Sequence, residues 1–393
     1  MMQTRPTTAY SPLGHSKAAL DFPLLGAVAA LCIAGIIFVF TSSAAHSWQT
    51  TNGDSITFLT NHLQRLAAGI VALVLFYHVR YQFLEKIARS VLVTTLIALV
   101  VVLILPKLPG TSAKRWILLF GLSFQPAELA KYALIAYASK RLSEIDDSSF
   151  PSDRKQKFNT LLGVIVLVLG LIIVEPNLSM VILICGTVLT LLLIHGIEWR
   201  KLLMMLPVAV VGIGAILLVK PYMIKRIAAF TDGVSDPLNT SYHVRQSLIA
   251  IGQGGWFGLG LGQSTQKHYY LPEPYNDSIF SIIGEEAGLV GALLLLSAFL
   301  VVIVRGWKIA LNAQDQFSYY LAAGITASLA CSMIINVGVN LALLPATGQP
   351  LPFVSYGGTS LVISLAAIGV LLNIAKQQNT STKWQGAARP LAN

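Results

Sequence analysis

Residues 269–296 read YYLPEPYNDSIFSIIGEEAGLVGALLLL, and the two halves of this stretch require different structures. The two prolines prevent a helix in the first half, because proline lacks an amide hydrogen and restricts the residue before it. The second half opens an apolar segment, residues 278–304, that is long enough to cross the roughly 30 Å hydrocarbon core of a bilayer. We therefore predict an uninterrupted membrane helix that begins beside Asp277 and carries Glu285 and Glu286 inside it.

The chain as a whole has the composition of an integral membrane protein. Of its 393 residues, 55% are hydrophobic and 11% are charged, and the mean hydropathy is +0.69. Soluble globular proteins carry about 25% charged residues. The first twenty residues lack the apolar core and cleavage site of a signal peptide, so we expect the first span to be retained. The predicted fold class is an all-α polytopic membrane protein.

Hydropathy over windows of about 19 residues predicts ten transmembrane helices. A large extracytoplasmic loop, about 220–277, separates helices 7 and 8. A single membrane domain, 23–375, then lies between an N-terminal cytoplasmic tail, 1–22, and a polar cytoplasmic tail, 376–393, that we expect to be disordered. The predicted spans are 23–43, 62–79, 87–105, 124–140, 159–175, 177–196, 201–219, 278–304, 318–341 and 357–375.

Lysine and arginine are unevenly distributed between the two sides of the predicted bundle. Most of the 27 fall in the loops on the side of both termini, which places both termini in the cytoplasm. The basic residues left for the outer loops are best explained by an anionic ligand such as a lipid phosphate. They include Lys114, Arg115, Lys131, Lys225, Arg226, Arg245 and Lys267. For Lys107, Lys220 and Arg65 we prefer the alternative of a snorkelling charge at the membrane interface.

The segment SFQPAELAK, residues 123–131, places an acid and a base on one helix face. Glu128 and Lys131 are three residues apart and therefore adjacent on a helix. They either neutralise each other or point together into a polar cavity, and we favour the cavity because it is the usual place of ionisable residues at membrane depth. Arg115, just upstream, carries a guanidinium suited to phosphate.

Asp277 is the candidate base of the chain. It stands at the start of the predicted helix, where the dipole favours the ionised carboxylate. The alternative is that Asn276 or Asp277 only caps the helix. Glu285 lies about 12 Å deeper, so we expect it and Glu286 to face a cavity, a partner side chain or a backbone donor.

Two further segments are rich in residues that prevent helices. LPATGQPLPFVSYGGTS, residues 344–360, either lines a wet cavity with hydroxyls such as Ser355 and Tyr356, or forms a structural hairpin. Six glycines between Gly252 and Gly262 match neither a dinucleotide fingerprint nor a Walker loop, so no nucleotide is expected. That glycine run either approaches a ligand closely or is a flexible lid.

Taken together, these segments resemble the SEDS family of peptidoglycan polymerases, and the form FSIIGEEAG is closer to its FtsW branch than to its RodA branch. The matching segments are KRWILLFGLSFQPAELAK, YHVRQSLIAIGQGGWFGLGLGQSTQKHYYLPEPYNDSIFSIIGEEAGLVG and LPATGQPLPFVSYGGTSL. They follow the family's order along a ten-span chain. From the residues alone, either an enzyme or a transporter of a lipid-phosphate substrate fits.

The resemblance implies glycosyl transfer during cell division at the outer face of the bacterial cytoplasmic membrane, in which lipid II is added to a glycan held on undecaprenyl pyrophosphate. Asp277 would be the general base on the acceptor 4-hydroxyl. Cations would hold the pyrophosphates, and a divalent ion, Mg or Mn, would share that role. The implied substrate-binding residues are Arg115, Glu128, Lys131, Arg226, Arg245, Lys267, Glu273, Ser355 and Tyr356.

The resemblance also implies partners: a class B penicillin-binding protein with transpeptidase activity, other divisome proteins and membrane lipid, but no nucleic acid. The chain departs from the family pattern at Asn177, where members often have aspartate, and at Tyr275 and Asn276, which replace histidine and threonine. We expect Asn177 to cap a helix. A lipid II flippase and a non-catalytic divisome scaffold are the alternative functions.

Overall fold

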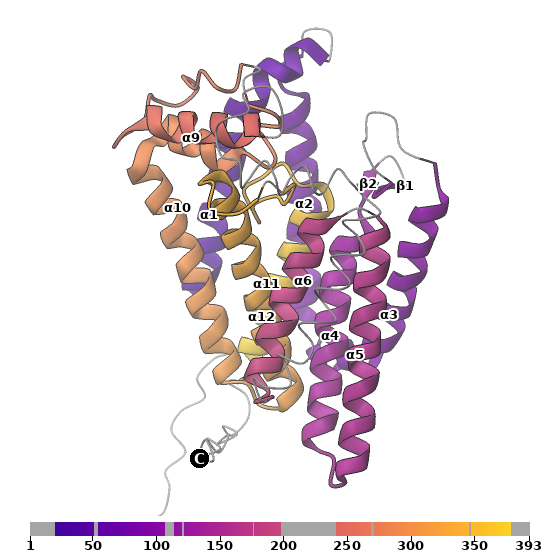
Figure 1. Cartoon of the computed structure of the whole chain (residues 1–393). Helices are drawn as coiled ribbons and strands as arrows, with labels where there is room; N and C mark the ends of the chain where they lie inside the picture. The colour runs from indigo at the N-terminus through magenta and orange to yellow at the C-terminus, as the bar shows by residue number, and fades with distance from the viewer. Residues whose placement is uncertain are drawn as a thin grey trace, which may run out of the picture.

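The computed structural model describes residues 20–50, 54–106, 114–119, 122–175, 177–197, 241–268, 271–345 and 347–378. These residues form ten α-helices and one short hairpin (Figure 1). The helices are α1 (Phe22–Thr50), α2 (Thr57–His78), α3 (Tyr81–Ile104), α4 (Pro126–Asp146), α5 (Pro151–Val174), α6 (Leu178–Ile194), α9 (Ser241–Gly254), α10 (Ile279–Leu311), α11 (Gln316–Asn340) and α12 (Gly358–Gln378). The hairpin pairs β1 (Ile117–Leu119) with β2 (Leu122–Phe124) in antiparallel register.

The predicted fold class is confirmed, because the chain is a polytopic bundle of apolar helices. Seven of the described helices are long and apolar enough to cross a membrane, namely α1, α2, α3, α5, α10, α11 and α12. The predicted spans 124–140 and 177–196 correspond to α4 and to the shorter apolar helix α6. The predicted span 201–219 lies outside the described residues, so the count of ten remains a prediction.

The helices stand side by side, and α9 lies across one end of the bundle (Figure 1). We call this end the α9 end; the β1–β2 hairpin and the start of α10 also lie there. The links from α4 to α5 and from α10 to α11 lie at the opposite end. Helices α11 and α12 are mostly buried, whereas only a minor share of α2, α3 and α5 is buried, as expected for helices that face lipid.

Helices α2 and α12 pack closely because each presents a glycine to the other. A Cβ atom on Gly69 would lie 2.5 Å from Cδ1 of Leu365, and one on Gly369 would overlap the carbonyl oxygen of Leu73. Small residues let membrane helices approach until their backbones are in contact. This contact fixes the position of α2 against the segment that leads into α12.

Helix α10 is not the uninterrupted helix that the sequence predicts. Gly288 has φ 66° and ψ −167°, which breaks the helix two residues after its acidic pair. The glycine-rich segment from α9 fills the break: the amides of Leu259 and Gly260 donate to the carbonyls of Glu285 and Glu286, at 2.9 and 3.0 Å. The prediction is wrong here because hydropathy carries no information about hydrogen bonds between the carbonyls of a helix and the amides of a loop.

The glycine run makes these loop–helix hydrogen bonds sterically possible. Gly258 has φ +80°, and a Cβ atom there would overlap the carbonyl group of Glu286. A Cβ atom on Gly288 would overlap the amide of Gly258 and the carbonyl of Trp256. At these positions the glycines therefore serve backbone packing against α10, a third possibility beside the ligand approach and the flexible lid.

The two buried glutamates of α10 bind the end of the same loop. Glu285 accepts hydrogen bonds from the Ser264 hydroxyl at 2.5 Å and the Thr265 amide at 2.8 Å. Glu286 forms an ion pair with Lys267 at 3.1 Å. The prediction that these carboxylates face a partner side chain or a backbone donor is confirmed, and their energetic cost is offset by these partners.

Substitution of Gly258 tests the loop–helix contact. Gly258→Val should lower the free energy of unfolding by about 3 kcal/mol, because it introduces both backbone strain and overlap. Gly252→Ala is the matched control, since no atom lies within 4 Å of its would-be Cβ; it should be neutral or slightly stabilising within a helix. Thermal unfolding of both purified variants measures the difference, and equal midpoints would contradict this packing.

Candidate functional site

Asp277 lies in a tight turn at the α9 end, immediately before α10. The helix begins at Ile279 with Ser278 in the N-cap position, so the alternative that Asn276 or Asp277 caps it is wrong. The carboxylate is half-buried. A Cβ atom on Gly348 would lie 3.0 Å from its Oδ2 oxygen, so the backbone of the 344–360 segment passes directly beside this carboxylate.

The turn is held by the 344–360 segment through its main chain. The Tyr356 amide donates to the carbonyl of Tyr275 at 2.9 Å, and the Ser355 hydroxyl donates to the carbonyl of Asn276 at 2.7 Å. Ser355 also accepts from the Leu351 amide at 2.8 Å. Both residues predicted as substrate ligands therefore position the turn that carries Asp277.

Helix α11 holds the next carbonyl, that of Asp277 itself. The side-chain amides of Asn336 and Asn340 both donate to it, each at 3.0 Å. Asn336 also donates to the Gln349 carbonyl at 2.8 Å, and the Ser281 hydroxyl donates to Asn340 at 2.7 Å. Neither asparagine is among the residues that the sequence predicts for the site. A signal was available, because they lie four residues apart in an apolar helix and therefore on one face.

The carbonyl oxygens of three consecutive residues, 275, 276 and 277, thus each accept a hydrogen bond from another part of the chain. The first two bonds come from the 344–360 segment and the third comes from α11. A backbone with this many fixed groups has little freedom. The position of the Asp277 carboxylate is consequently set by the fold.

Two of the predicted cations are already paired with acids inside the protein. Lys131 and Glu128 form an ion pair at 2.9 Å, with each side chain only 2% exposed. Lys267 is paired with Glu286 and also donates to the Gly262 carbonyl at 2.5 Å. In this structure the mutually neutralising alternative holds for Glu128 and Lys131, because burial without a partner would be costly for either charge.

The remaining predicted residues occupy varied positions. Arg115 is half-buried, and its Nε donates to the Glu175 carbonyl at 3.1 Å, which ties the hairpin segment to the link between α5 and α6. Arg245 is exposed on α9. Glu273 is exposed, has φ 45° and accepts from the Asn276 side chain at 3.0 Å. Arg226 lies outside the described residues.

Aromatic side chains cover the turn on the side of α1 and α2. The Tyr275 ring lies 4.8 Å from Phe58 and 5.7 Å from Tyr356, and His46 lies 5.6 Å from Tyr275. Burial raises the pKa of Tyr275 to about 12, with neighbouring carboxylates adding to the shift. The phenol is therefore neutral over the physiological range. Helix α2, for which the sequence predicts no role in this site, supplies one wall of it.

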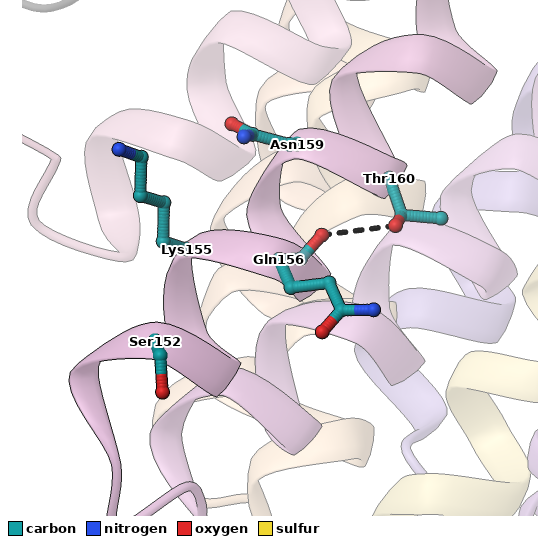
Figure 2. A pocket seen from close by; sticks show the side chains of 5 residues that line it. All are labelled: Ser152, Lys155, Gln156, Asn159 and Thr160. Atoms are coloured by element: carbon teal, nitrogen blue, oxygen red, sulfur yellow. Dashed lines mark hydrogen bonds between the residues drawn. The ribbon is translucent and has the colours of Figure 1, made fainter.

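The sequence-predicted divalent cation stays a prediction. Within the described residues, no three side chains among His, Cys, Asp and Glu come together as a metal site. A separate hollow, shown in Figure 2, is lined by Ser152, Lys155, Gln156, Asn159 and Thr160. All five belong to the first turns of α5, at the end of the bundle opposite the start of α10 (Figure 1).

Glu175 is a second buried carboxyl at the α9 end, between α5 and α6. Neither of its side-chain oxygens has a hydrogen-bond partner among the described residues. Burial raises its pKa from 4.5 to about 8, and the nearby Arg115 opposes the shift only in part. Asn177, two residues later, accepts from the Met180 amide at 3.4 Å, so its predicted role as a helix cap is confirmed.

The chain matches the family described as "Cell cycle protein" (FtsW/RodA/SpoVE) over residues 23–380. Stage V sporulation protein E of Bacillus subtilis (strain 168) is 36% identical over 366 residues, covering 92% of this chain and 98% of that protein. A probable peptidoglycan glycosyltransferase FtsW of Geobacter sp. (strain M18) is 35% identical over 374 residues, covering 93% and 97%.

Solved structures share the fold. A chain from a peptidoglycan synthase complex, described as coordinating polymerization and crosslinking, superposes with a TM-score of 0.74 at 25% identity. Rod shape determining protein RodA of Thermus thermophilus gives a TM-score of 0.66, also at 25% identity. Each comparison covers 92% of this chain and 98% of the other.

Glu175 makes the stability of the protein depend on pH. Its pKa is higher in the folded state than the ordinary value of 4.5, so its contribution to stability is complete below that value and is lost as the pH rises through 8. Glu175→Gln cannot ionise and should flatten the fall of the unfolding midpoint between pH 5 and 9.

Asp54 provides a control of opposite sign for that measurement. Hydrogen bonds from the Ile56 amide and the Thr57 hydroxyl lower its pKa below 3.8, so its contribution is present above that value and lost at lower pH. Asp54→Asn should leave the range from pH 5 to 9 unchanged. A Glu175→Gln midpoint that falls as steeply as wild type would contradict the buried carboxyl.

Proposed function

The chain belongs to the FtsW/RodA/SpoVE family of cell cycle proteins, and we propose that it polymerises lipid II into glycan strands during cell division. It is a peptidoglycan glycosyltransferase of the FtsW kind, as its relatives are named. The observation that carries the chemistry is the Asp277 carboxylate, set at one end of a membrane bundle on a turn whose three carbonyls are each bonded elsewhere. A carboxylate held in this way suits a general base.

In the proposed reaction the 4-hydroxyl of the acceptor sugar attacks the anomeric carbon of the donor sugar, which is bonded to the lipid pyrophosphate. The Asp277 carboxylate takes the hydroxyl proton as the new glycosidic bond forms. The bond between that carbon and the pyrophosphate oxygen breaks, and the lipid pyrophosphate leaves with the electron pair. Cationic side chains at the α9 end, Arg115 and Arg245 among the described residues, would stabilise the charge on the leaving group.

The proposal places the α9 end at the outer face of the cytoplasmic membrane. It is supported by the basic residues of the opposite end, which include Arg141, Arg154, Lys155 and Lys157 around the α4–α5 link. Cytoplasmic ends of membrane bundles carry such an excess. Both termini are then cytoplasmic, since α1 starts and α12 ends on that side.

A transpeptidase partner also belongs to the proposal. The solved synthase complex that shares this fold is described as coordinating polymerization and crosslinking. We expect this chain to act with a class B penicillin-binding protein that crosslinks the new strand, together with other divisome proteins at the septum.

Reconstitution with labelled lipid II tests the proposed activity. Wild-type protein in liposomes, with its transpeptidase partner, should form glycan chains, and Asp277→Asn should lower the rate by about 10²–10⁴-fold because the amide cannot accept the proton. Asp54→Asn removes another carboxylate between α1 and α2 and should leave the rate unchanged. Gel separation of the glycan products measures all three.

The same assay separates the alternative functions. Transfer of lipid II between leaflets without any polymer would replace the enzyme by a flippase. Polymer made only by the partner, at the same rate with Asp277→Asn, would make this chain a scaffold. Polymerisation by this chain that survives Asp277→Asn would remove Asp277 as the base while leaving the activity.

Asn336 should act as a positioning residue. Asn336→Leu keeps the approximate size but removes the donor shared by the Asp277 and Gln349 carbonyls. A displacement of the turn by about 1 Å can cost about 10²-fold in rate. We expect a fall in kcat of that order with KM nearly constant. Asn312→Leu, in the exposed link between α10 and α11, is the control; a change confined to KM would contradict this role.

A further inference from the structure

Arg65 points toward the site and not toward the membrane interface, contrary to the snorkelling charge that the sequence suggests. Its guanidinium carbon lies 4.5 Å from the centroid of the Tyr356 ring. A Cβ atom on Gly358 would lie 3.5 Å from both its Cζ and its Nε. The side chain is half-buried in the third turn of α2. A snorkelling side chain would instead extend along the lipid-facing surface.

This guanidinium has no acid to neutralise it among the described residues. Five other cations of the described chain have one: Lys131 with Glu128, Lys267 with Glu286, Arg141 with Glu144, Lys157 with Asp153 and Arg305 with Asp21. Helix α2 itself contains no aspartate or glutamate. Charges in membrane helices are expensive and normally mark a functional site when their partner is absent from the protein.

His62, one turn before Arg65, is a second polar group without a partner. It is 0% exposed, and neither ring nitrogen has a hydrogen-bond partner among the described residues. Its ring stacks on that of Tyr356 with centroids 6.3 Å apart. Leaving a buried polar group unsatisfied costs about 1–3 kcal/mol. Two unsatisfied donor-bearing side chains of α2 therefore meet the same tyrosine.

Tyr356 connects these groups to the proposed catalytic turn. Its amide donates to the Tyr275 carbonyl at 2.9 Å, two residues before Asp277, and its ring lies 5.7 Å from the ring of Tyr275. The glycine contacts between α2 and α12 hold α2 in place. Arg65 is consequently a fixed cation in the same structural unit as Asp277.

We propose that Arg65 is an anion-binding residue of this site and holds a phosphate of the lipid-linked pyrophosphate. The proposal rests on the proposed function, because that function supplies the ligand. Stacking occupies the face of the guanidinium and leaves its N–H edge free for two parallel hydrogen bonds to phosphate oxygens. Lysine offers neither the planar stack nor the paired donors. His62, beside it, adds a further donor from the same helix.

Binding measured without turnover tests this inference separately from catalysis. All variants carry Asp277→Asn and are placed in nanodiscs of zwitterionic lipid. The probe is undecaprenyl pyrophosphate, with undecaprenyl monophosphate and phosphatidylglycerol as competing sources of phosphate. Arg65→Gln should weaken pyrophosphate binding by tenfold or more, and Arg65→Lys by less. Lys155→Gln, which removes an exposed cation of α5 at the opposite end, should bind as the parent does.

Two results would overturn the inference. One is unchanged pyrophosphate affinity in Arg65→Gln, whatever happens to its thermal stability, since Arg65 would then only pack against Tyr356. The other is equal displacement by phosphatidylglycerol, which would make Arg65 a contact for bulk lipid. Failure of the proposed function gives a different pattern: the Asp277-containing protein forms no glycan, while the pyrophosphate lipid still binds through Arg65.

Discussion

Backbone polar groups inside a membrane protein must find partners within the chain, and this requirement organises the α9 end of the molecule. Among the places there where the chain leaves helical geometry are the turn before α10, the break at Gly288 and the link between α11 and α12. In each place another segment provides the missing bonds. The turn before α10 depends on Ser355, Tyr356 and two asparagines of α11, while the break at Gly288 depends on the glycine-rich loop. Segments far apart in sequence are thereby joined into one unit around Asp277.

Buried charged side chains likewise find most of their partners within the chain. Most buried ionic groups of the described chain are compensated internally, and these pairs fasten elements together: Lys267 and Glu286 attach the loop to α10, and Arg305 and Asp21 join α10 to the start of α1. Arg65 and Glu175 differ, because the described residues provide neither an opposite charge for the guanidinium nor a donor for the carboxyl oxygens. An enzyme acting on a phosphorylated lipid has a use for such groups at the end where its base stands.

For several residues the contacts in the structure add to or differ from those that the sequence predicts. The sequence favours a polar cavity for Glu128 and Lys131, whereas in the structure they neutralise each other. The reason is that residues three apart on a helix are adjacent, so each buried charge has its opposite charge beside it. Ser355 and Tyr356, for which substrate contact stays a prediction, hold the Asp277 turn through a hydroxyl and an amide. Glu285 and Glu286 face partner side chains and a backbone donor as predicted, although the sequence does not identify which residues these are.

The sequence by itself determined the class of the molecule, the approximate helices and the candidate base, since hydropathy, proline positions and a loop aspartate are local properties of the chain. Its motifs also indicated the family and hence the chemistry. Tertiary structure alone decided which cations are already paired, which backbone groups hold Asp277 in place, and that Arg65 turns inward onto Tyr356. The physical reason is that a charge or a carbonyl is satisfied by whatever lies beside it in space. For Asp277 those neighbours lie on α11, some 60 residues further along the chain, and for Arg65 the neighbour is Tyr356, some 290 residues away in the segment before α12.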